Sequence, residues 1–143
     1  MELIEELKAF QTFLRDEQQK FTRERALIAK EALFHRRHFT AEDLLEAVHR
    51  RDPSVSRASV YRTIALLVKS KLLEKHDFGV MKNYYERLVG IRHHDHLICI
   101  HCGEIIEFHN DTIERLQDVI LKRHHFTMVY HSHKIFGLCR KCQ

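Results

Sequence analysis

The chain has 143 residues, of which 44% are hydrophobic, and a formal net charge of +4. This length fits one medium domain or two small ones, and the hydrophobic content excludes an intrinsically disordered chain. No apolar run approaches the length that spans a bilayer, and the acidic N-terminus "MELIEELKAF" lacks the basic and apolar regions of a secretion signal. We therefore expect a cytoplasmic protein, whose cysteines remain thiols unless a metal or catalysis uses them.

Basic residues are concentrated in the N-terminal half. Residues 20–75 contain thirteen Lys and Arg against seven Asp and Glu, a balance of +6, whereas residues 1–17 contain two against five, a balance of −3. A basic segment of this size indicates an anionic partner, and nucleic acid is the usual one. A solvated, lysine-rich helical face is the alternative on charge alone.

Four amphipathic helices are predicted in this half. The first spans residues 2–18, and the others span 22–34, 40–51 and 56–73. Each of the last three begins at a hydroxyl residue that can act as N-cap: Thr22, Thr40 (in a Thr40-x-x-Asp43 pattern close to a capping box) and Ser56.

Residues 72–88 then predict two short strands around the turn Asp77-Phe78-Gly79. Three short helices followed by a two-stranded ribbon are typical of a winged helix-turn-helix, in which the third helix enters the DNA major groove. The exposed face of that helix is predicted to carry Arg57, Ser59, Tyr61 and Arg62. A helical bundle with a solvated face is the alternative.

The C-terminal half predicts strands at 93–101 and 104–109, a helix to about residue 124, and a strand at 126–139. The helix is expected to be capped at Asp111-x-x-Glu114 and to turn Ile113, Leu116 and Ile120 inward. We therefore expect an α+β protein of two domains: a winged helix-turn-helix domain (1–86) that includes the extra helix 2–18, a hinge (87–92), and a small α/β domain (93–143). A unit of this size is marginal alone and often needs a metal or a partner subunit.

All four cysteines fall in two CxxC pairs, Cys99/Cys102 and Cys139/Cys142. Two such pairs complete the four-sulfur tetrahedral shell that Zn(II) prefers, so a structural zinc is predicted. A redox dithiol is the main alternative, but no thioredoxin-like pattern surrounds either pair.

The segment "HHDH" (93–96) holds four consecutive residues that can bind metals. If it is part of a strand, His93 and Asp95 point to one face, and His94 and His96 point to the other. Two sites are therefore predicted, each completed by distant residues. Imidazole with carboxylate suits Fe(II), Mn(II), Zn(II) or Co(II). Exposed histidines on a polar strand are the alternative.

Three segments, "HFTAEDL" (38–44), "SVYRTI" (59–64) and "HHDHLICIHCGEIIEF" (93–108), together with the C-terminal CxxC, resemble the ferric uptake regulator family of bacterial metal-dependent repressors. The resemblance runs from about residue 20 to the end. It implies that the cysteines hold the family's structural zinc. It implies a regulatory site between the DNA-binding and dimerisation domains, formed by His38, Glu86, His94, His96 and Glu107.

The resemblance also implies an additional metal site within the dimerisation domain, formed by His93, Asp95, Glu114 and His131. Lys20 is similar to a minor-groove contact of the family, and Tyr61 and Arg62 are similar to contacts of its recognition helix. The implied partners are a double-stranded DNA operator and a second copy of the chain, in a homodimer or a tetramer. No membrane and no small-molecule substrate are implied.

The function implied is Fe(II)-responsive repression of iron-uptake genes, with Mn(II), Zn(II) or Co(II) able to substitute. Zinc, manganese and peroxide sensors of the family are the alternatives. The resemblance places aspartates in peroxide sensors where this chain has Glu86 and Glu107, which favours the iron regulator. Zinc sensing stays open, because imidazole and carboxylate ligands do not select iron by affinity.

Two readings outside the family are less favoured. His93-x-Asp95 with His131 is the ligand pattern of non-haem Fe(II) oxygenases. The barrel of those enzymes, however, needs many more strands than this chain can supply. A zinc-stabilised protein-interaction module leaves the basic winged helix unexplained. We therefore expect no enzyme activity.

Overall fold

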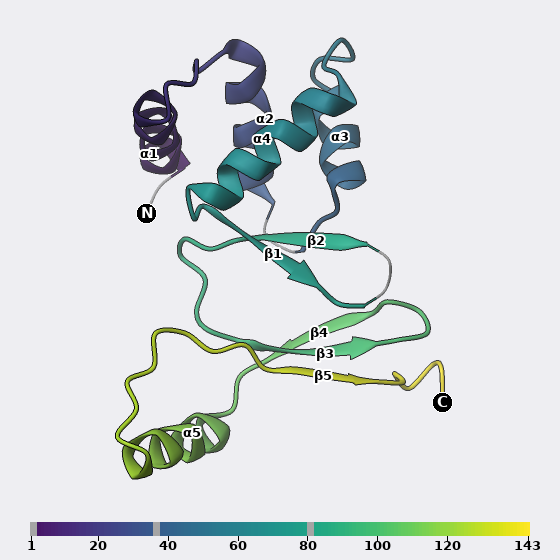
Figure 1. Ribbon diagram of the computed structural model, residues 1–143. Helices are drawn as coiled ribbons and strands as arrows, with labels where there is room; N and C mark the ends of the chain where they lie inside the picture. The colour runs from purple at the N-terminus through teal and green to yellow at the C-terminus, as the bar shows by residue number, and fades with distance from the viewer. Residues whose placement is uncertain (1–2, 36–37, 80–81) are drawn as a thin grey trace. The chain divides into compact units, whose positions relative to one another are not determined.

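The computed structural model describes residues 3–35, 38–79 and 82–143 (Figure 1). The chain divides into two compact units, one up to Ile91 and one from Arg92 to Gln143. Residue 2, where the first helix was predicted to begin, lies outside the described residues.

Four helices build the first unit: α1 (Leu3–Asp16), α2 (Arg23–Phe34), α3 (Ala41–His49) and α4 (Arg57–Lys69). The predicted N-caps of the last three are all present. The Thr22 hydroxyl accepts a hydrogen bond from the Arg25 N–H at 3.2 Å, and the Ser56 hydroxyl accepts one from the Ser59 N–H at 3.1 Å. These bonds satisfy amide groups that the first helical turn leaves without partners.

The capping box at the start of α3 is complete. The Asp43 N–H donates to the Thr40 hydroxyl at 3.1 Å, and the Thr40 N–H donates to the Asp43 carboxylate at 2.7 Å. Partial burial raises the pKa of the Asp43 carboxyl, but the hydrogen bonds from Thr40 outweigh it and hold that pKa below its usual value. The predicted start of α3 is confirmed.

The apolar faces of the four helices meet in one core. Its fully buried members include Phe10 and Leu14 of α1, Leu33 of α2, Leu44 of α3 and Leu67 of α4. Burying a side chain of this size contributes about 1.5–3 kcal/mol. The core fixes α4 against the other helices and leaves its opposite face at the surface.

A two-stranded ribbon follows α4. It consists of β1 (Leu73–Asp77) and β2 (Asn83–Arg87), paired antiparallel, with Glu74 opposite Glu86 and His76 opposite Tyr84. Helix α4 ends at Lys69, earlier than the predicted 73, because the backbone turns at Lys71 with a φ of +58° before β1 begins. The predicted ribbon is present.

Phe39, in front of α3, is joined to the ribbon by an isolated antiparallel bridge to Tyr85. The Phe39 N–H donates to the Tyr85 carbonyl at 3.0 Å, and the Tyr85 N–H donates to the Phe39 carbonyl at 2.8 Å. In this register His38 is beside Glu86.

The added helix α1 is attached to the same ribbon by an ion pair. Arg87, the last residue of β2, donates from Nε to Glu6 at 2.8 Å and from Nη2 at 2.6 Å. Glu6 is 0% exposed, so its carboxylate is held by a bidentate contact inside the protein.

The second unit contains a three-stranded sheet in the order β4-β3-β5. Its strands are β3 (Asp95–Cys99), β4 (Ile105–Phe108) and β5 (Lys134–Gly137). β4 is antiparallel to β3, and β5 is parallel to it. All three strands are shorter than predicted, and residues 126–133 are not a strand because the ladder with β3 begins only at Lys134.

Helix α5 (Asp111–Arg123) follows β4. Its N-cap is Asn110, whose side-chain oxygen accepts from the N–H groups of Thr112 and Ile113 at 3.0 and 3.1 Å, so the predicted cap at Asp111 is wrong. The prediction that Ile113, Leu116 and Ile120 turn inward is also wrong for the single chain. No residue of α5 is buried, and Leu116 is 58% exposed.

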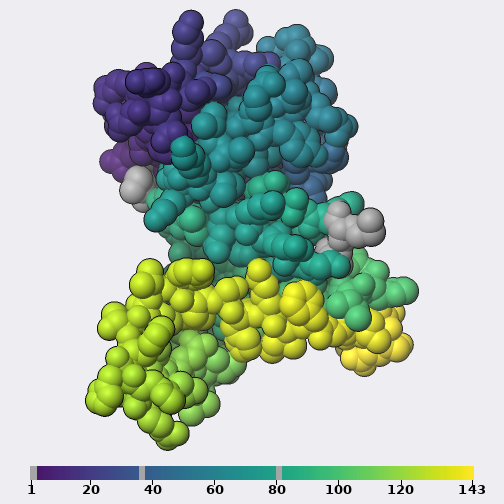
Figure 2. Space-filling view, viewed as in Figure 1, coloured from purple at the N-terminus to yellow at the C-terminus, as the bar shows by residue number. Residues whose placement is uncertain are grey.

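Apolar side chains cover much of the surface of the second unit. Only Ile98 and Cys99 among its apolar residues are buried. In Figure 2 the residues after α5, coloured yellow-green to yellow, are at the surface, and they include Phe126 (68% exposed) and Val129 (93%). Among the helices of the described residues, none is long and apolar enough to cross a membrane.

Candidate metal centres and nucleic-acid interface

The four cysteines converge at one end of the β3–β5 pair. Cys99 ends β3 and pairs with Gly137, and Cys139 follows two residues later. The Sγ atoms of Cys102 and Cys139 are 3.6 Å apart, and all four Sγ atoms are within 4.8 Å of one another. A Zn–S distance of about 2.3 Å places tetrahedral sulfurs about 3.8 Å apart, so the cluster fits Zn(II).

These thiols are free and differ in acidity. Hydrogen bonds from the N–H groups of Cys102 and Cys139 lower the pKa of Cys99 to about 6. Burial raises the pKa of Cys142 to about 12, and the neighbouring cysteines add to the rise. One thiolate therefore forms readily, and a cation that binds it favours ionisation of the others.

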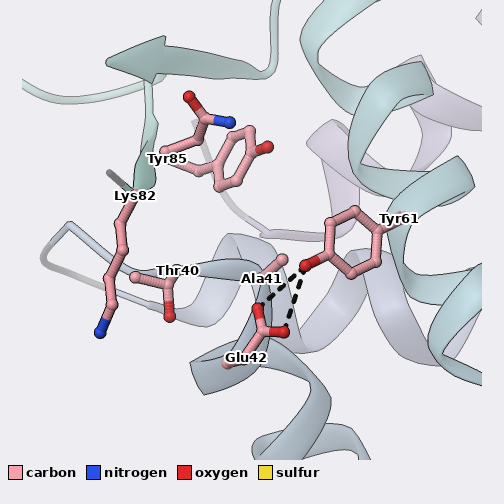
Figure 3. A pocket seen from close by; sticks show the side chains of 7 residues that line it. Thr40, Ala41, Glu42, Tyr61, Lys82 and Tyr85 are labelled. Atoms are coloured by element: carbon pink, nitrogen blue, oxygen red, sulfur yellow. Dashed lines mark hydrogen bonds between the residues drawn. The ribbon is translucent and has the colours of Figure 1, made fainter. Parts of the chain in front are cut away.

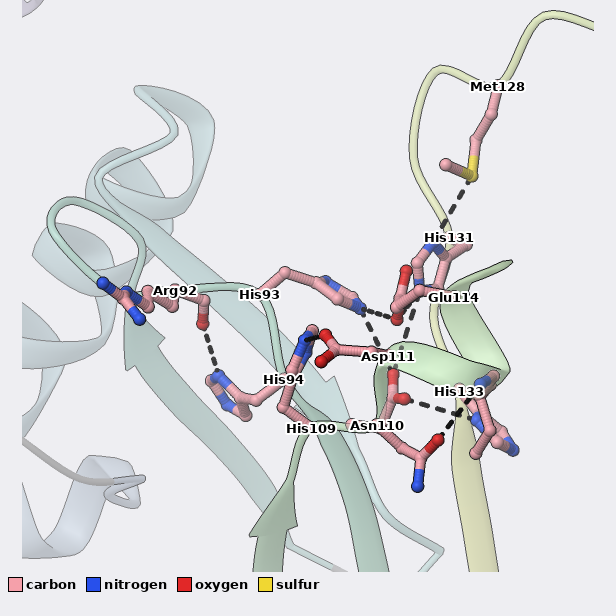
Figure 4. Close-up of polar contacts among 12 residues, drawn as sticks. Arg92, His93, His94, His109, Asn110, Asp111, Glu114, Met128, His131 and His133 are labelled. Carbon is pink, nitrogen blue, oxygen red and sulfur yellow. Dashed lines mark hydrogen bonds and ion pairs between the residues drawn. The ribbon is translucent and has the colours of Figure 1, made fainter. Parts of the chain in front are cut away.

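A second cluster contains the four residues of the predicted additional site. Three of them, His93, Glu114 and His131, are labelled in Figure 4. The Nε2 atom of His93 is 3.3 Å from Asp95 Oδ1 and 3.3 Å from Glu114 Oε1. The Nε2 atom of His131 is 3.8 Å and 3.6 Å from the same two oxygens. Three separate segments of the second unit supply these groups: the approach to and start of β3, the first turn of α5, and the residues before β5.

Four polar atoms that face the centre of this cluster have no hydrogen-bond partner. Both oxygens of Asp95, Oε1 of Glu114 and Nε2 of His131 are buried and have no hydrogen-bond partner. Buried polar atoms without partners cost about 1–3 kcal/mol each. Carboxylate oxygens and imidazole nitrogens that meet in this way fit a divalent cation.

The predicted division of "HHDH" between two faces is consistent with the ring contacts. The ring centroids of His93 and His131 are 4.2 Å apart, and those of His94 and His96 are 4.8 Å apart. Strand β3 begins only at Asp95, so regular alternation applies to Asp95 and His96 and not to the two residues before them.

The other face of β3 holds the second unit's part of the predicted regulatory set. His96 is the direct cross-strand partner of Glu107 on β4, so their side chains lie on the same face. The Nδ1 atom of His94 is 2.9 Å from the Arg92 carbonyl oxygen. A hydrogen bond of this kind orients a ligand imidazole.

The first unit brings the remaining two residues of that set together. The Nε2 atom of His38 is 3.3 Å from Glu86 Oε2, as the bridge between Phe39 and Tyr85 requires. Two residues that the sequence reading missed complete a further group: His76 Nε2 is 3.0 Å from Glu86 Oε2 and 3.8 Å from Glu74. The strand alternation of Glu74 and His76 was visible in the sequence, but the register that places Glu86 opposite Glu74, and so on the face that His76 shares, was not.

The predicted DNA-reading helix α4 presents Arg57 and Tyr61 at the surface. Both contact Glu42 of α3: Arg57 forms an ion pair with it, and the Tyr61 hydroxyl is 3.0 and 3.2 Å from its two oxygens (Figure 3). Tyr61 and Glu42 line a pocket of about 430 Å³ with Lys82 of the ribbon. The role of Glu42 was missed, because only the register of α3 against α4 reveals it.

Ser59 corrects the predicted exposed face, because it is buried. Its hydroxyl lies 3.0 Å from the Ser56 hydroxyl, and Arg62 donates to it at 3.3 Å. Ser59 therefore positions Arg62 instead of facing a groove. Arg62 lines a concavity of about 340 Å³ that also contains the predicted DNA contact Lys20 and Arg25, which the sequence reading did not select.

The comparisons with known proteins agree with this architecture. The model of the Ferric uptake regulator family matches residues 16–136. The Ferric uptake regulation protein of Campylobacter jejuni is 37% identical over 138 residues, which cover 95% of this chain and 87% of that protein.

Two solved structures extend the agreement to the fold. The Helicobacter pylori ferric uptake regulator Fur, described as having three functional metal binding sites, gives a TM-score of 0.89 at 27% identity over 99% of this chain and 94% of that one. A zinc-bound manganese uptake regulator gives 0.67 at 30% identity over 92% and 98%. The predicted α+β fold is therefore confirmed. With the family model, the curated relative and both structures in agreement, the chain belongs to the Ferric uptake regulator family.

Proposed function

We propose that this protein is a metal-dependent DNA-binding transcriptional repressor that responds to Fe(II) and controls iron-uptake genes. The observation that carries the proposal is the presence of oxygen and nitrogen ligands in both units: His38 and Glu86 in the first, and His94, His96 and Glu107 in the second. We assign these five residues to one regulatory ion.

A shared ion gives a physical basis for regulation. A divalent cation supplies bonds that hold ligands from both units at once. His38 and Glu86 are attached to the ribbon that follows the DNA-reading helix α4. Ligation therefore favours one placement of α4, and the chain shifts towards that state in proportion to its higher affinity for the ion there.

The four-cysteine cluster has a different role in this proposal. Four thiolates leave no open coordination position on Zn(II), so the site is structural. It joins the residues after β5 to the end of β3. The His93, Asp95, Glu114 and His131 cluster is proposed as an additional metal site within the second unit, in keeping with three sites in the Helicobacter pylori relative.

The working form is proposed to be a homodimer. The second unit buries almost no apolar side chain of its own, and Ile106, Leu97 and Ile135 form an exposed cross-strand row on its sheet. A unit of this size with this much exposed apolar surface is stabilised by a partner. Two α4 helices related by a twofold axis match the half-sites of a palindromic operator.

Two observations favour Fe(II) as the regulatory metal in this proposal. The similar protein of Campylobacter jejuni is a Ferric uptake regulation protein, and the regulatory set contains two glutamates, Glu86 and Glu107. Zinc, manganese and peroxide sensing are the alternatives within the family, and one similar structure is a manganese uptake regulator. The protein is proposed to act in the cytoplasm, where its DNA is, and to have no enzyme activity.

Binding to an operator duplex at defined free concentrations of Fe(II), Mn(II) and Zn(II) tests the proposal. We expect binding that requires metal and weakens steeply with salt, because phosphate contacts supply much of the affinity. His96→Ala should lose the metal response and keep its zinc, whereas His124→Ala, at an exposed histidine outside every cluster, should behave as the unsubstituted protein. Equal DNA binding by chelator-treated protein would overturn the switch.

A further inference from the structure

The two oxygens of Asp95 face different imidazole rings. Oδ1 is 3.3 Å from His93 Nε2 and 3.8 Å from His131 Nε2. Oδ2 is 3.4 Å from Nδ1 of His133, a residue that Figure 4 labels. His133 is not among the ligands that the sequence predicted for the additional site, and it lies outside the four residues whose ligand atoms are all within 4.8 Å of one another, but it contacts the second oxygen of Asp95.

Backbone pairing places His133 at this position. The His96 N–H donates to the His133 carbonyl at 3.1 Å, and Lys134 pairs with His96 in the parallel ladder. His133 is therefore held beside Asp95, and its ring centroid is 6.0 Å from that of Phe108, the cross-strand partner of Asp95. The ring is fixed by the sheet and by an aromatic neighbour.

Neither member of this pair has a hydrogen bond there. Nδ1 of His133 is buried without a hydrogen-bond partner, as are both oxygens of Asp95, whose side chain is 1% exposed. A direct hydrogen bond between the two is the cheapest way to satisfy them. His133 Nδ1 thus shares one property with His131 Nε2: each is a buried imidazole nitrogen that faces an oxygen of Asp95 without a hydrogen bond.

Gln117 adds an oxygen on the helix side. It lies three residues after Glu114 on α5, which places both side chains on one helical face. Its Oε1 atom is also buried and without a hydrogen-bond partner. An amide oxygen is a hard donor of the kind that Fe(II) and Mn(II) accept more readily than thiolate-preferring ions.

We propose that His133 is a fifth ligand of the additional site and that Gln117 supplies a further oxygen. The donor set is then three imidazole nitrogens, from His93, His131 and His133, with two carboxylates and one amide oxygen. Five or six donors suit Mn(II), Fe(II) or Co(II) and exceed the four that Zn(II) commonly takes. The inference rests on the additional metal site of the proposed function and specifies its coordination number and preferred ions.

Anaerobic Co(II) titration of the full chain, with its cysteine site loaded with zinc, tests this assignment. The background variant is His96→Ala, so that the regulatory set does not contribute to the signal. The d–d absorption of Co(II) distinguishes the weak bands of five- or six-coordinate ions from the intense bands of tetrahedral ones. We expect weak bands in the background protein and one bound ion per chain beyond zinc.

In that background, His133→Leu should weaken Co(II) binding at least about tenfold and move the spectrum towards the tetrahedral form. His133→Leu should also shift Mn(II) and Zn(II) competition towards zinc. The matched control is His124→Leu, at an exposed histidine outside the cluster, which should leave spectrum and affinity unchanged. Gln117→Leu should raise the band intensity less than His133→Leu does.

Two outcomes overturn the inference: tetrahedral bands in the background protein, or an unchanged spectrum and affinity in His133→Leu. The cobalt spectrum of the background protein does not depend on the folding of His133→Leu. It therefore remains a decisive test if that variant is unstable. Metal-dependent operator binding by the unsubstituted protein is measured separately. A protein that keeps that response while failing either cobalt test refutes the His133 assignment and leaves the proposed function standing.

Discussion

Glu6 and Arg87 show how a buried charge joins the added helix α1 to the ribbon. Glu6 is 0% exposed and accepts two hydrogen bonds from Arg87. Arg87 follows Glu86 directly, so the contact that holds α1 ends one residue from a proposed regulatory ligand. A displacement of α1 would therefore act on Arg87, the residue next to Glu86.

Removal of this carboxylate is expected to destabilise the first unit. Glu6→Ala leaves the guanidinium without its bidentate partner at a largely buried position, which costs on the order of 3 kcal/mol. Chemical denaturation monitored by circular dichroism measures the change. Glu5→Ala, at an exposed residue of the same helix, is the control and should change stability by less than about 0.5 kcal/mol. Equal stability of the two variants would contradict the role of the pair.

Cys99 is the thiol expected to be ionised first, since its pKa is lowered to about 6 by the N–H groups of Cys102 and Cys139. Cys99→Ser should lose zinc, because three thiolates and a hydroxyl bind zinc far less tightly than four thiolates do. The second unit should lose thermal stability as a consequence. Zinc content by mass spectrometry and a melting curve measure both effects. Retention of one zinc per chain with an unchanged melting curve would refute the structural role.

At the scale of elements, α3 and α4 are linked through Glu42. Its carboxylate accepts from Tyr61 and pairs with Arg57, so an acidic residue holds two of the exposed side chains on the proposed DNA-reading face. If α4 binds DNA as proposed, DNA phosphates and bases would compete with that contact. We therefore expect Glu42 to lower the affinity of α4 for DNA in general.

Glu42→Gln should accordingly strengthen binding to operator and to unrelated DNA by about two- to fivefold, the range that an exposed ion pair allows. Fluorescence anisotropy at several salt concentrations measures it. Glu46→Gln, which removes the same charge from the same helix where it pairs with Arg50, is the matched control. Affinity that falls, or that rises equally in both variants, would show that Glu42 does not restrain the helix.

Local signals in the sequence were sufficient to predict where α2, α3 and α4 begin. The N-caps Thr22, Thr40 and Ser56 and the capping box act through residues at most three positions away, so they can be read from the chain. Contacts that depend on register could not be read in this way. His133 and Glu74 join their clusters only through strand pairing, and Ser59 was placed on the wrong side of α4 because the hydroxyl packs against Ser56.

At the scale of the whole molecule, the incorrect prediction is that the apolar residues of α5 are buried within the single chain. Leu116 and Ile120 form an apolar stripe, and such a stripe predicts burial without stating what buries it. In the single chain nothing does, and the same holds for Leu97, Ile106 and Ile135 on the sheet. The sequence prediction assigned the stripe to the chain's own core, whereas the structure of the single chain leaves it exposed.

Ile106→Glu tests whether a second copy covers this surface. A charge placed in the apolar row is expected to dissociate the dimer, because burying an unpaired carboxylate costs several kcal/mol. Sedimentation measures the oligomeric state over a range of concentrations. Thr112→Glu adds the same charge at the exposed start of α5, where helix N-termini favour it, and should leave the dimer intact. If the Ile106→Glu variant remained dimeric, the dimer interface would have to lie on another surface of the protein.

The parallel pairing of β3 with β5 imposes an order on maturation. These strands are separated in the chain by β4 and α5, so their ladder closes a long loop and forms late in folding. Cys139 follows β5 closely, while His131 and His133 precede it. If the cysteines and the additional site bind metals as proposed, we expect zinc capture by the cysteines to bring the histidines to Asp95, so that a newly made chain binds its other ions only after zinc. On the proposed function, the response to iron would then depend on an earlier supply of zinc.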